Sequence, residues 1–309
     1  MPRSAILAAA RSARMRSLIE TMPVTRSVVG RFVAGSQTAD AVRVASELMA
    51  DGRRVTLDHL GEDTTDRARA HATVTAYRTV LTVLADAGVS AGCDVSVKLS
   101  AIGRQLPADG EKIALDNARA ICATAAGAGA TVTLDMEDHT TTDSTLAILR
   151  ELRTDFPWVG AVLQAYLRRT EQDCRDLAGA GSRVRLCKGA YAEPASVVYR
   201  DRYDVDRSYL RCLGILMRGR GYPMVATHDP KIIKLARRLV ADTGRDRTGY
   251  EFQMLYGVRP AEQRRIAARC DPLRVYVPYG VEWYGYFVRR LAERPANLAF
   301  FLRSLATKG

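Results

Sequence analysis

The chain has 309 residues, of which 47% are hydrophobic and 26% are charged, and its 46 Lys and Arg against 34 Asp and Glu give a formal net charge of +12. This composition excludes a disordered chain and provides enough apolar residues for one sizeable core. Because the basic residues are scattered, they indicate solvated helix faces more than a nucleic-acid-binding stripe, although they would favour contact with anionic lipid.

The first 50 residues predict a helical lead-in, and residues 51–309 predict one catalytic domain. The opening MPRSAILAAARSARMRSLIETMP has a short apolar run interrupted by arginines, which is typical neither of a signal peptide nor of a membrane span. We expect a helix packed against the base of the domain, with a basic amphipathic helix lying on a membrane as the alternative. Six cysteines without a CxxC pair indicate reduced core residues in a cytoplasmic protein.

Short runs rich in β-branched residues alternate with longer segments of helical periodicity. The strand-like runs are Arg54–Leu60, Val95–Ser100, Thr131–Glu137, Val159–Tyr166, Val184–Tyr191, Met224–Asp229, Tyr250–Gly257 and Leu273–Val277. The segments with helical periodicity include Asp109–Gly127, Thr142–Phe156, Pro230–Gly244 and Pro260–Cys270. This alternation predicts parallel strands joined by outer helices. Eight such units without a linker predict an α/β fold, a (βα)8 TIM barrel.

The last strand-like run leads through a break at Pro278 and Gly280 into a final helical segment. Four polar residues of that segment, Tyr286, Arg289, Arg290 and Glu293, have the spacing i, i+3, i+4 and i+7 and therefore share one helix face. Two adjacent arginines on such a face can form a forked clamp for a carboxylate. A solvated basic helix face is the simpler interpretation of an Arg pair.

In a parallel barrel the carboxyl ends of all strands meet at one mouth, where active sites lie. The polar residues at or just after these ends are Asp58, His59, Glu62, Lys98, Asp135, Glu137, Asp138, Gln164, Arg185, Lys188, Thr227, His228, Gln253 and Tyr276. Each has a structural explanation when taken alone; Lys98, for example, could extend its ammonium to solvent, and Asp135 could cap a helix. Their joint placement indicates a site.

Several kinds of site lack support in the sequence. The histidines do not have metal-ligand spacing, and no HExxH, GxGxxG, Walker A or GxSxG pattern occurs, so neither a metal site nor a dinucleotide fold, P-loop or serine nucleophile is indicated. The richest segment is RLCKGAY at Arg185–Tyr191. Gly189 permits close approach of the backbone to a ligand, while Arg185 and Lys188 supply positive charge.

The ordered motifs from about Arg31 to Asn297 resemble the proline dehydrogenase family of flavin-dependent enzymes. The resemblance rests on VTLDHLGE at Val55–Glu62, SVKLS at Ser96–Ser100, LDMED at Leu134–Asp138, QAYLRR at Gln164–Arg169, RLCKGAY at Arg185–Tyr191, ATHD at Ala226–Asp229, FQMLYG at Phe252–Gly257 and YGYFVRRLAERPAN at Tyr284–Asn297. It implies a distorted (βα)8 barrel with N-terminal helices and its last helix over the barrel mouth.

The resemblance also implies a role for individual residues. On the substrate side, Arg289 and Arg290 would hold the proline carboxylate, with Lys98 also at the substrate and Asp135 orienting Lys98. Tyr276, Tyr286 and Leu186 would wall the ring, and Glu62 would pair with the first clamp arginine. On the cofactor side, the implied flavin-binding residues are Met136, Gln164, Arg185, Lys188, Gly189, Ala190, Thr227 and His228. Arg185 would lie close to the reactive flavin nitrogen, and Asp135 and Arg185 would be the catalytic pair.

The implied reaction is FAD-dependent oxidation of L-proline to Δ1-pyrroline-5-carboxylate by hydride transfer to flavin N5, with a quinone as electron acceptor. A cytoplasmic protein is expected, with candidate peripheral contact at the inner face of the membrane and pyrroline-5-carboxylate dehydrogenase as a candidate partner. No metal and no nucleic acid are expected.

Two departures from the family pattern leave the clamp untouched: Cys187 stands where valine is common, and Ser36–Gln37 stand where glutamate is frequent. Tyr276 favours proline, because hydroxyproline-preferring relatives have a smaller residue there. Two other interpretations stay open. A flavin barrel similar to methylenetetrahydrofolate reductase would accept NAD(P)H, and a basic nucleic-acid-binding protein would bind DNA with a steep salt dependence.

Overall fold

A computed structural model describes the backbone of residues 29–293 and the side chains of residues 29–288. Its eight strands are β1 (Arg54–His59), β2 (Cys93–Val97), β3 (Thr131–Leu134), β4 (Gly160–Gln164), β5 (Arg183–Cys187), β6 (Tyr222–Ala226), β7 (Glu251–Leu255) and β8 (Leu273–Tyr279). All neighbouring pairs are parallel, and β8 pairs with β1 to close the barrel. The predicted eight-stranded α/β barrel is therefore confirmed.

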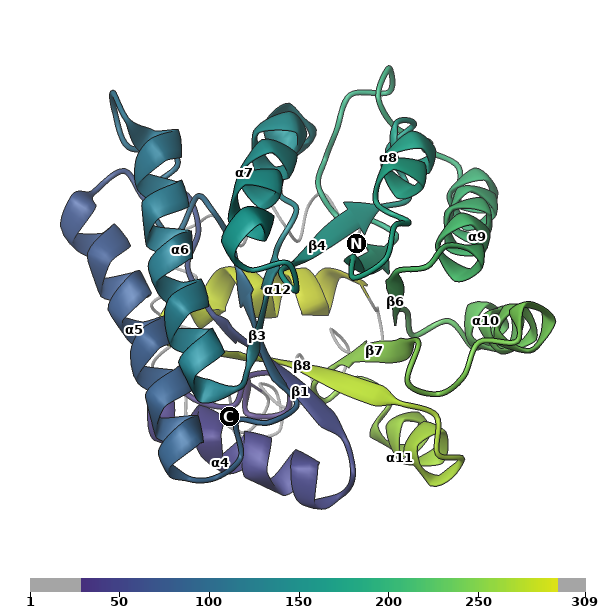
Figure 1. Ribbon diagram of the computed structural model, residues 1–309, viewed down its shortest axis with the longest axis horizontal. Helices are drawn as coiled ribbons and strands as arrows, with labels where there is room; N and C mark the ends of the chain where they lie inside the picture. The colour runs from purple at the N-terminus through teal and green to yellow at the C-terminus, as the bar shows by residue number, and fades with distance from the viewer. Residues whose placement is uncertain (1–28, 294–309) are drawn as a thin grey trace, which may run out of the picture.

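Helices surround the strands on the outside (Figure 1). They are α4 (Thr38–Ala50), α5 (Arg67–Asp86), α6 (Gly110–Ala128), α7 (Thr142–Asp155), α8 (Thr170–Asp176), α9 (Arg202–Arg218), α10 (Pro230–Thr243) and α11 (Pro260–Ala268), with the 3-10 turn η1 (His139–Thr141) before α7. Three of these helices, α5, α9 and α10, are preceded by an aspartate at the N-cap. The side chains of Asp66, Asp201 and Asp229 each accept a hydrogen bond from a backbone N–H of the first helical turn. Such capping satisfies donors that the helix itself cannot pair.

The last helix, α12 (Trp283–Glu293), crosses the barrel (Figure 1). Its residues Tyr286 and Phe287 pack in one cluster with Leu60, which directly follows β1, so α12 covers the carboxyl ends of the strands. Residues preceding α4 join this end of the molecule, because Ala34 N–H donates to the Pro278 carbonyl at 2.9 Å. No helix in the described range 29–293 is long and apolar enough to cross a membrane.

The strand ends differ from the predicted ones: β1 to β7 end one to four residues earlier than predicted, and β8 ends later. β8 continues through Pro278 to Tyr279, whereas the sequence predicts a break there. A proline fits because its carbonyl still accepts a hydrogen bond and its ring nitrogen has no proton to leave unpaired. β5 ends at Cys187, four residues before its predicted end, and Gly189 then adopts a φ of +104° that is incompatible with a strand.

The strands present opposite chemistry on their two faces. Outward residues such as Leu57, Val95 and Leu134 are fully buried in the main hydrophobic core. Inward residues are polar, because Asp94 of β2 accepts hydrogen bonds from Thr56 of β1 and Thr133 of β3 across the interior. The barrel thus has an apolar outer layer and a polar interior, where branched apolar side chains are usual.

An arginine–glutamate pair neutralises the lower part of this interior. Arg274 donates to both carboxylate oxygens of Glu251, at 2.6 and 3.1 Å, and both side chains are buried. Burial alone would raise the pKa of Glu251, but attraction to Arg274 and the hydrogen bonds from it lower that pKa from 4.5 to about 2. The ionised carboxylate therefore stabilises the folded barrel.

We predict that Glu251→Gln lowers the free energy of unfolding by about 3 kcal/mol at pH 7, because it leaves the buried Arg274 without its counter-ion. The folded-state pKa lies below the unfolded one, so the contribution is complete above pH 4.5 and is lost as the pH falls toward 2. Urea unfolding at pH 7 and pH 3 measures this.

The matched control is Glu47→Gln, because Glu47 pairs with Arg43 on the surface and both side chains are more than half exposed. Its cost should stay below about 1 kcal/mol. Equal losses of unfolding free energy in the two variants would contradict a stabilising role for the buried ion pair. So would a difference in unfolding free energy between Glu251→Gln and the parent protein that is as large at pH 3 as at pH 7.

Candidate active site

Arg185 is the central cation of the barrel interior. Its side chain is 4% exposed and projects inward from β5. Nη1 donates to Asp135 at 3.0 Å and to Ser96 at 2.7 Å, Nε donates to Gln253 at 2.6 Å, and Nη2 lies 3.3 Å from Asp94. Contacts from two other strands, β2 and β7, and from the residue after β3 fix the plane of the guanidinium, which a single ion pair would leave free to rotate.

Asp135 directly follows β3 and connects Arg185 to the mouth of the barrel. One of its oxygens accepts from Ser96 at 2.8 Å, and the other accepts from the Tyr276 hydroxyl at 3.0 Å. The Arg185 guanidinium also lies over the Tyr276 ring, with Cζ 5.2 Å from the centroid, a cation–π geometry. The two residues predicted as the catalytic pair, Asp135 and Arg185, are therefore in direct contact.

Lys98 follows β2 and lies beside two carboxylates. Its Nζ is 3.3 Å from both oxygens of Asp58 and 3.9 Å from Asp135. Burial would lower the pKa of Lys98, but the charges of Asp58 and Asp135 outweigh burial and raise it, so the ammonium keeps its proton. The sequence predicts Asp135 as the residue that orients Lys98. In the structure Asp58 is the carboxylate closer to the Lys98 ammonium, and Asp135 is the second.

The predicted apolar wall needs one correction. Leu186 alternates with the inward-pointing Arg185, is fully buried in the outer hydrophobic core and therefore does not face the mouth. Leu255 continues the inward series from Gln253 and pairs with Tyr276 in register. Tyr276 is half-buried at the rim, as predicted.

The other predicted wall residue, Tyr286, lies in α12, where it is buried in the cluster that joins this helix to Leu60. The side chains of Arg289 and Arg290 lie outside the described residues, although their backbone belongs to α12. Glu62 is half-buried, and its negative charge contributes to the raised pKa of Lys98. The clamp and its pairing with Glu62 stay predictions.

The loop after β5 carries three of the predicted flavin-binding residues. Gly189 has a φ of +104°, and a Cβ there would come within 2.1 Å of the Tyr166 ring, so only glycine fits. Lys188 extends its ammonium to Asp206 at 2.5 Å and Asp229 at 3.5 Å. Ala190 is exposed.

The remaining predicted flavin-binding residues are nearby on neighbouring strand ends. The Gln164 side chain of β4 donates to the Glu137 carbonyl at 2.7 Å, and Met136 is buried after β3. The Thr227 hydroxyl accepts from Asp229 N–H at 3.1 Å. His228 Nε2 accepts from Leu255 N–H at 2.8 Å, which makes Nδ1 the protonated ring nitrogen when the imidazole is neutral.

Sequence reasoning missed the polar residues within the strands. Asp94 and Ser96 of β2 and Lys98 just after it occupy alternate positions. Glu251, Gln253 and Leu255 do so along β7, so each series points inward. Asp94 and Glu251 begin their series near the amino ends of β2 and β7, away from the carboxyl ends at which the sequence predicts the site. The period-2 polar pattern is the signal that identifies them.

A cavity of about 350 Å3 lies outside the barrel, between α4 and α11, and is lined by Glu47, Arg53, Tyr256 and Gln263 among others. None of the predicted site residues lines it. The chemistry-bearing groups are instead those gathered around Arg185 and Lys98.

These residues fit a flavin. An isoalloxazine ring needs a cation near the nitrogens that gain negative charge on reduction, which Arg185 provides, and amide or hydroxyl groups for its polar edge, which Gln164 and Thr227 provide. Gly189, which has no side chain, allows the turn after β5 to pack against the Tyr166 ring. The donor set is neutral or cationic, as an anionic cofactor requires.

Comparisons with known proteins agree with this chemistry. The family described as "Proline dehydrogenase" matches residues 41–303. The chain is 37% identical over 284 residues to "Proline dehydrogenase 1" of Bacillus subtilis subsp. natto, covering 92% of both chains. It is 41% identical over 279 residues to "Proline dehydrogenase" of Deinococcus radiodurans, covering 89% of both.

A solved structure of proline utilization A from Bdellovibrio bacteriovorus, inactivated by N-propargylglycine, superimposes with a TM-score of 0.80 at 25% identity. The match covers 87% of this chain but 33% of that one, so the likeness concerns one part of a longer protein. A family match across most of the sequence, two full-length relatives and a shared barrel lead to one conclusion: the chain belongs to the proline dehydrogenase family.

Proposed function

We propose that this enzyme oxidises L-proline to Δ1-pyrroline-5-carboxylate and uses FAD as its electron acceptor. The observation that supports this most is the contact between Arg185, Asp135 and Tyr276 with Lys98 beside them, inside a barrel of the proline dehydrogenase family. The barrel mouth therefore holds two cations: Lys98, which can bind a carboxylate, and Arg185, which can interact with an electron-rich ring.

Binding of proline requires a positive site for its carboxylate. Lys98 keeps its proton because Asp58 and Asp135 raise its pKa, and we propose that it acts together with Arg289 and Arg290 of α12. Tyr276 and Tyr286, with Leu255 in place of the predicted Leu186, would wall the ring. Clamping the carboxylate and enclosing the ring fixes the carbon beside the nitrogen, and such positioning supplies on the order of several kcal/mol of barrier reduction.

Tyr276 acts by holding a proton rather than by removing one. Burial raises the pKa of its phenol well above the usual value, and the negative charge of Asp135 raises it further. The hydroxyl therefore stays protonated and donates to Asp135, which keeps that carboxylate turned toward Arg185. The proton that leaves the substrate nitrogen goes to another acceptor or to solvent.

The residues proposed to hold FAD are Met136, Gln164, Arg185, Lys188, Gly189, Ala190, Thr227 and His228, as in the expectation from the sequence. When bound, FAD supplies the two-electron acceptor for the hydride that leaves the proline ring. Arg185, fixed by its four partners, would stabilise the negative charge that gathers above it.

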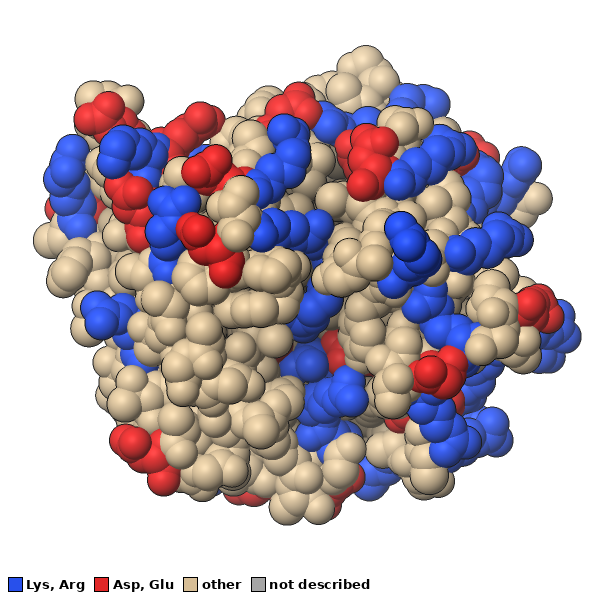
Figure 2. Space-filling model, in the orientation of Figure 1, with Lys and Arg blue, Asp and Glu red and all other residues tan. Residues whose placement is uncertain are grey.

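The two electrons must then leave the protein, and we propose a quinone as their acceptor. Basic side chains are spread over the side of α8 to α11 on the face shown in Figure 2, which favours a peripheral contact of a cytoplasmic protein with anionic lipid. Liposome flotation tests this contact, and protein left unbound in both redox states argues against it. Pyrroline-5-carboxylate dehydrogenase is the proposed recipient of the product.

The first test is a visible spectrum of the purified protein supplied with FAD. Flavin absorbance should appear on the protein and should bleach when L-proline is added without oxygen, then return when a soluble quinone is supplied. A protein that binds flavin but is bleached by NADH and not by proline would be a methylenetetrahydrofolate reductase-like enzyme, and a colourless protein would remove the proposal.

The clamp is tested by Arg290→Lys. We expect KM for proline to rise at least tenfold, because an ammonium cannot make the forked contact of a guanidinium, while FAD stays bound. Arg264→Lys, at an exposed position of α11, is the control and should leave KM unchanged. A steady-state proline assay compares them, and equal kinetics in both variants argue against the clamp.

Gly189→Ala should weaken FAD retention by at least tenfold. The added methyl group would meet the Tyr166 ring and the backbone would be forced from its positive φ, so the loop after β5 must move. Gly179→Ala is a control, because a Cβ there meets nothing within 4 Å. Equilibrium titration of the two apoproteins with FAD, followed by protein fluorescence, gives the two affinities; equal values would exclude a role for the turn.

A further inference from the structure

We propose that Asp94, at the floor of the barrel, is a positioning residue that sets the reduction potential of the bound cofactor through Arg185. This inference rests on the proposed function, because it requires a flavin above Arg185. It adds a residue to which the family resemblance gives no role and which lies on the side of Arg185 away from Lys98 and Asp58.

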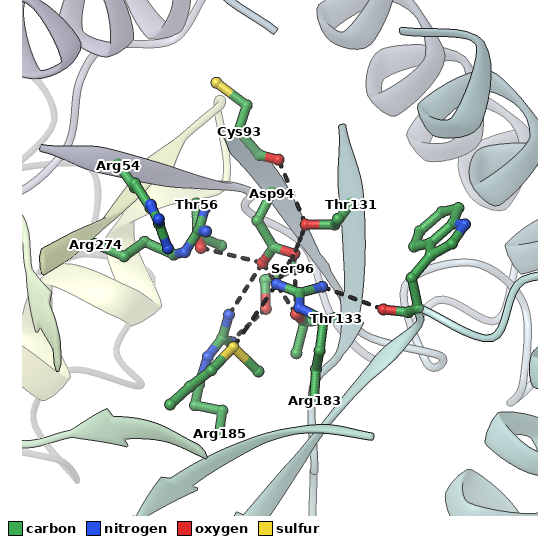
Figure 3. Close-up of polar contacts among 12 residues, drawn as sticks. Arg54, Thr56, Cys93, Asp94, Ser96, Thr131, Thr133, Arg183, Arg185 and Arg274 are labelled. Atoms are coloured by element: carbon green, nitrogen blue, oxygen red, sulfur yellow. Dashed lines mark hydrogen bonds and ion pairs between the residues drawn. The ribbon is translucent and has the colours of Figure 1, made fainter. Parts of the chain in front are cut away.

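Asp94 is the acceptor on which the barrel interior converges. Its side chain is fully buried, and its two oxygens accept from the hydroxyls of Thr56 at 3.1 Å, Thr131 at 2.7 Å and Thr133 at 3.0 and 3.1 Å. Figure 3 shows these side chains directed at one carboxylate from the two strands that flank β2, namely β1 and β3. Three hydroxyl donors hold an ionised carboxylate where no water reaches it.

Two arginines of one strand share this carboxylate. Arg183 Nη2 lies 3.3 Å from Oδ1 of Asp94, and Arg185 Nη2 lies 3.3 Å from Oδ2 (Figure 3). Arg183 also donates to the Trp158 carbonyl, whereas Arg185 continues upward to Asp135. The charge of Asp94 is thus divided between a floor arginine and the arginine of the active site.

A second floor carboxylate lies one step further from Arg185. Glu251 accepts from the Gln253 amide at 2.7 Å, and the carbonyl oxygen of that amide accepts from Arg185 Nε at 2.6 Å. Glu251 also accepts two hydrogen bonds from Arg274, and one each from Arg54 and Tyr222. Asp94 is therefore the floor carboxylate with a direct ionic contact to Arg185, and Glu251 provides a comparison at equal burial.

The physical consequence concerns the charge that a ligand above Arg185 experiences. A carboxylate in contact with a buried guanidinium cancels part of its field, and in a poorly solvated interior this cancellation is not screened away. Reduction adds negative charge to a flavin, so a more positive surrounding raises its potential and a less positive one lowers it. Removing Asp94 or removing Arg183 should therefore have opposite effects.

The experiment measures the midpoint potential of FAD-loaded protein by anaerobic titration with a reference dye. Asp94→Asn should shift the equilibrium toward reduced flavin by about tenfold, which corresponds to about 30 mV for a two-electron couple. Arg183→Met should shift it several-fold toward oxidised flavin, because it removes a floor cation and leaves Asp94 to Arg185 alone. A general loosening of the fold would not shift the midpoint potential in opposite directions in these two variants.

Two variants serve as controls. Thr131→Val removes a hydrogen bond to Asp94 without changing charge and should leave the equilibrium within twofold of the parent, even where it lowers thermal stability. Glu251→Gln removes the same charge as Asp94→Asn, but Glu251 reaches Arg185 only through Gln253. It should therefore raise the midpoint potential less than Asp94→Asn does. Flavin occupancy and circular dichroism confirm that each variant is loaded and folded.

The outcomes separate this inference from the proposed function. A parent protein that binds no FAD overturns the proposed function itself. A parent that binds FAD and is reduced by proline, with Asp94→Asn and Arg183→Met both within twofold of it, overturns only the role of Asp94. If Asp94→Asn does not fold, Arg183→Met alone tests the inference. A lower midpoint potential in Arg183→Met supports the inference, and an unchanged potential overturns it.

Discussion

The contact of one buried guanidinium with two carboxylates organises the interior of this barrel. Arg185 lies between Asp94 on the floor side and Asp135 on the mouth side, and Asp135 in turn lies near Lys98, which contacts Asp58. Charges therefore alternate along the axis. A charge removed from water is tolerated only where an opposite charge and hydrogen bonds replace the water, so each member of this column requires its neighbours.

This arrangement divides the work between the two faces of every strand. Outward aliphatic residues pack against the helices and supply the hydrophobic free energy, so the inward positions are released from that task and can carry polar chemistry. The cost is that the interior cannot adapt to single changes, because an unpaired buried ion is far more costly than an imperfect apolar contact. A rigid interior also holds Arg185 still, which an electrostatic role in catalysis requires.

The sequence predicts the fold well because strand and helix periodicities alternate cleanly and all eight strands are buried. It predicts the site less completely. The family resemblance implies Leu186 at the substrate, whereas its side chain lies in the outer hydrophobic core, on the strand face opposite to Arg185. The preference of Lys98 for Asp58 depends on which strands are neighbours, since β1 adjoins β2 on one side and β3 adjoins it on the other. The Arg289 and Arg290 clamp stays a prediction from sequence.

The pairing of β1 with β8 has a consequence for folding during synthesis on the ribosome. β1 is made early, but one of its edges cannot meet its native partner until residues 273–279 have emerged, and Arg274 then donates to the Val55 carbonyl 219 positions away. During translation that edge presents free backbone groups to any other strand in the cell. Slow final closure of the barrel follows from the ring shape of the sheet.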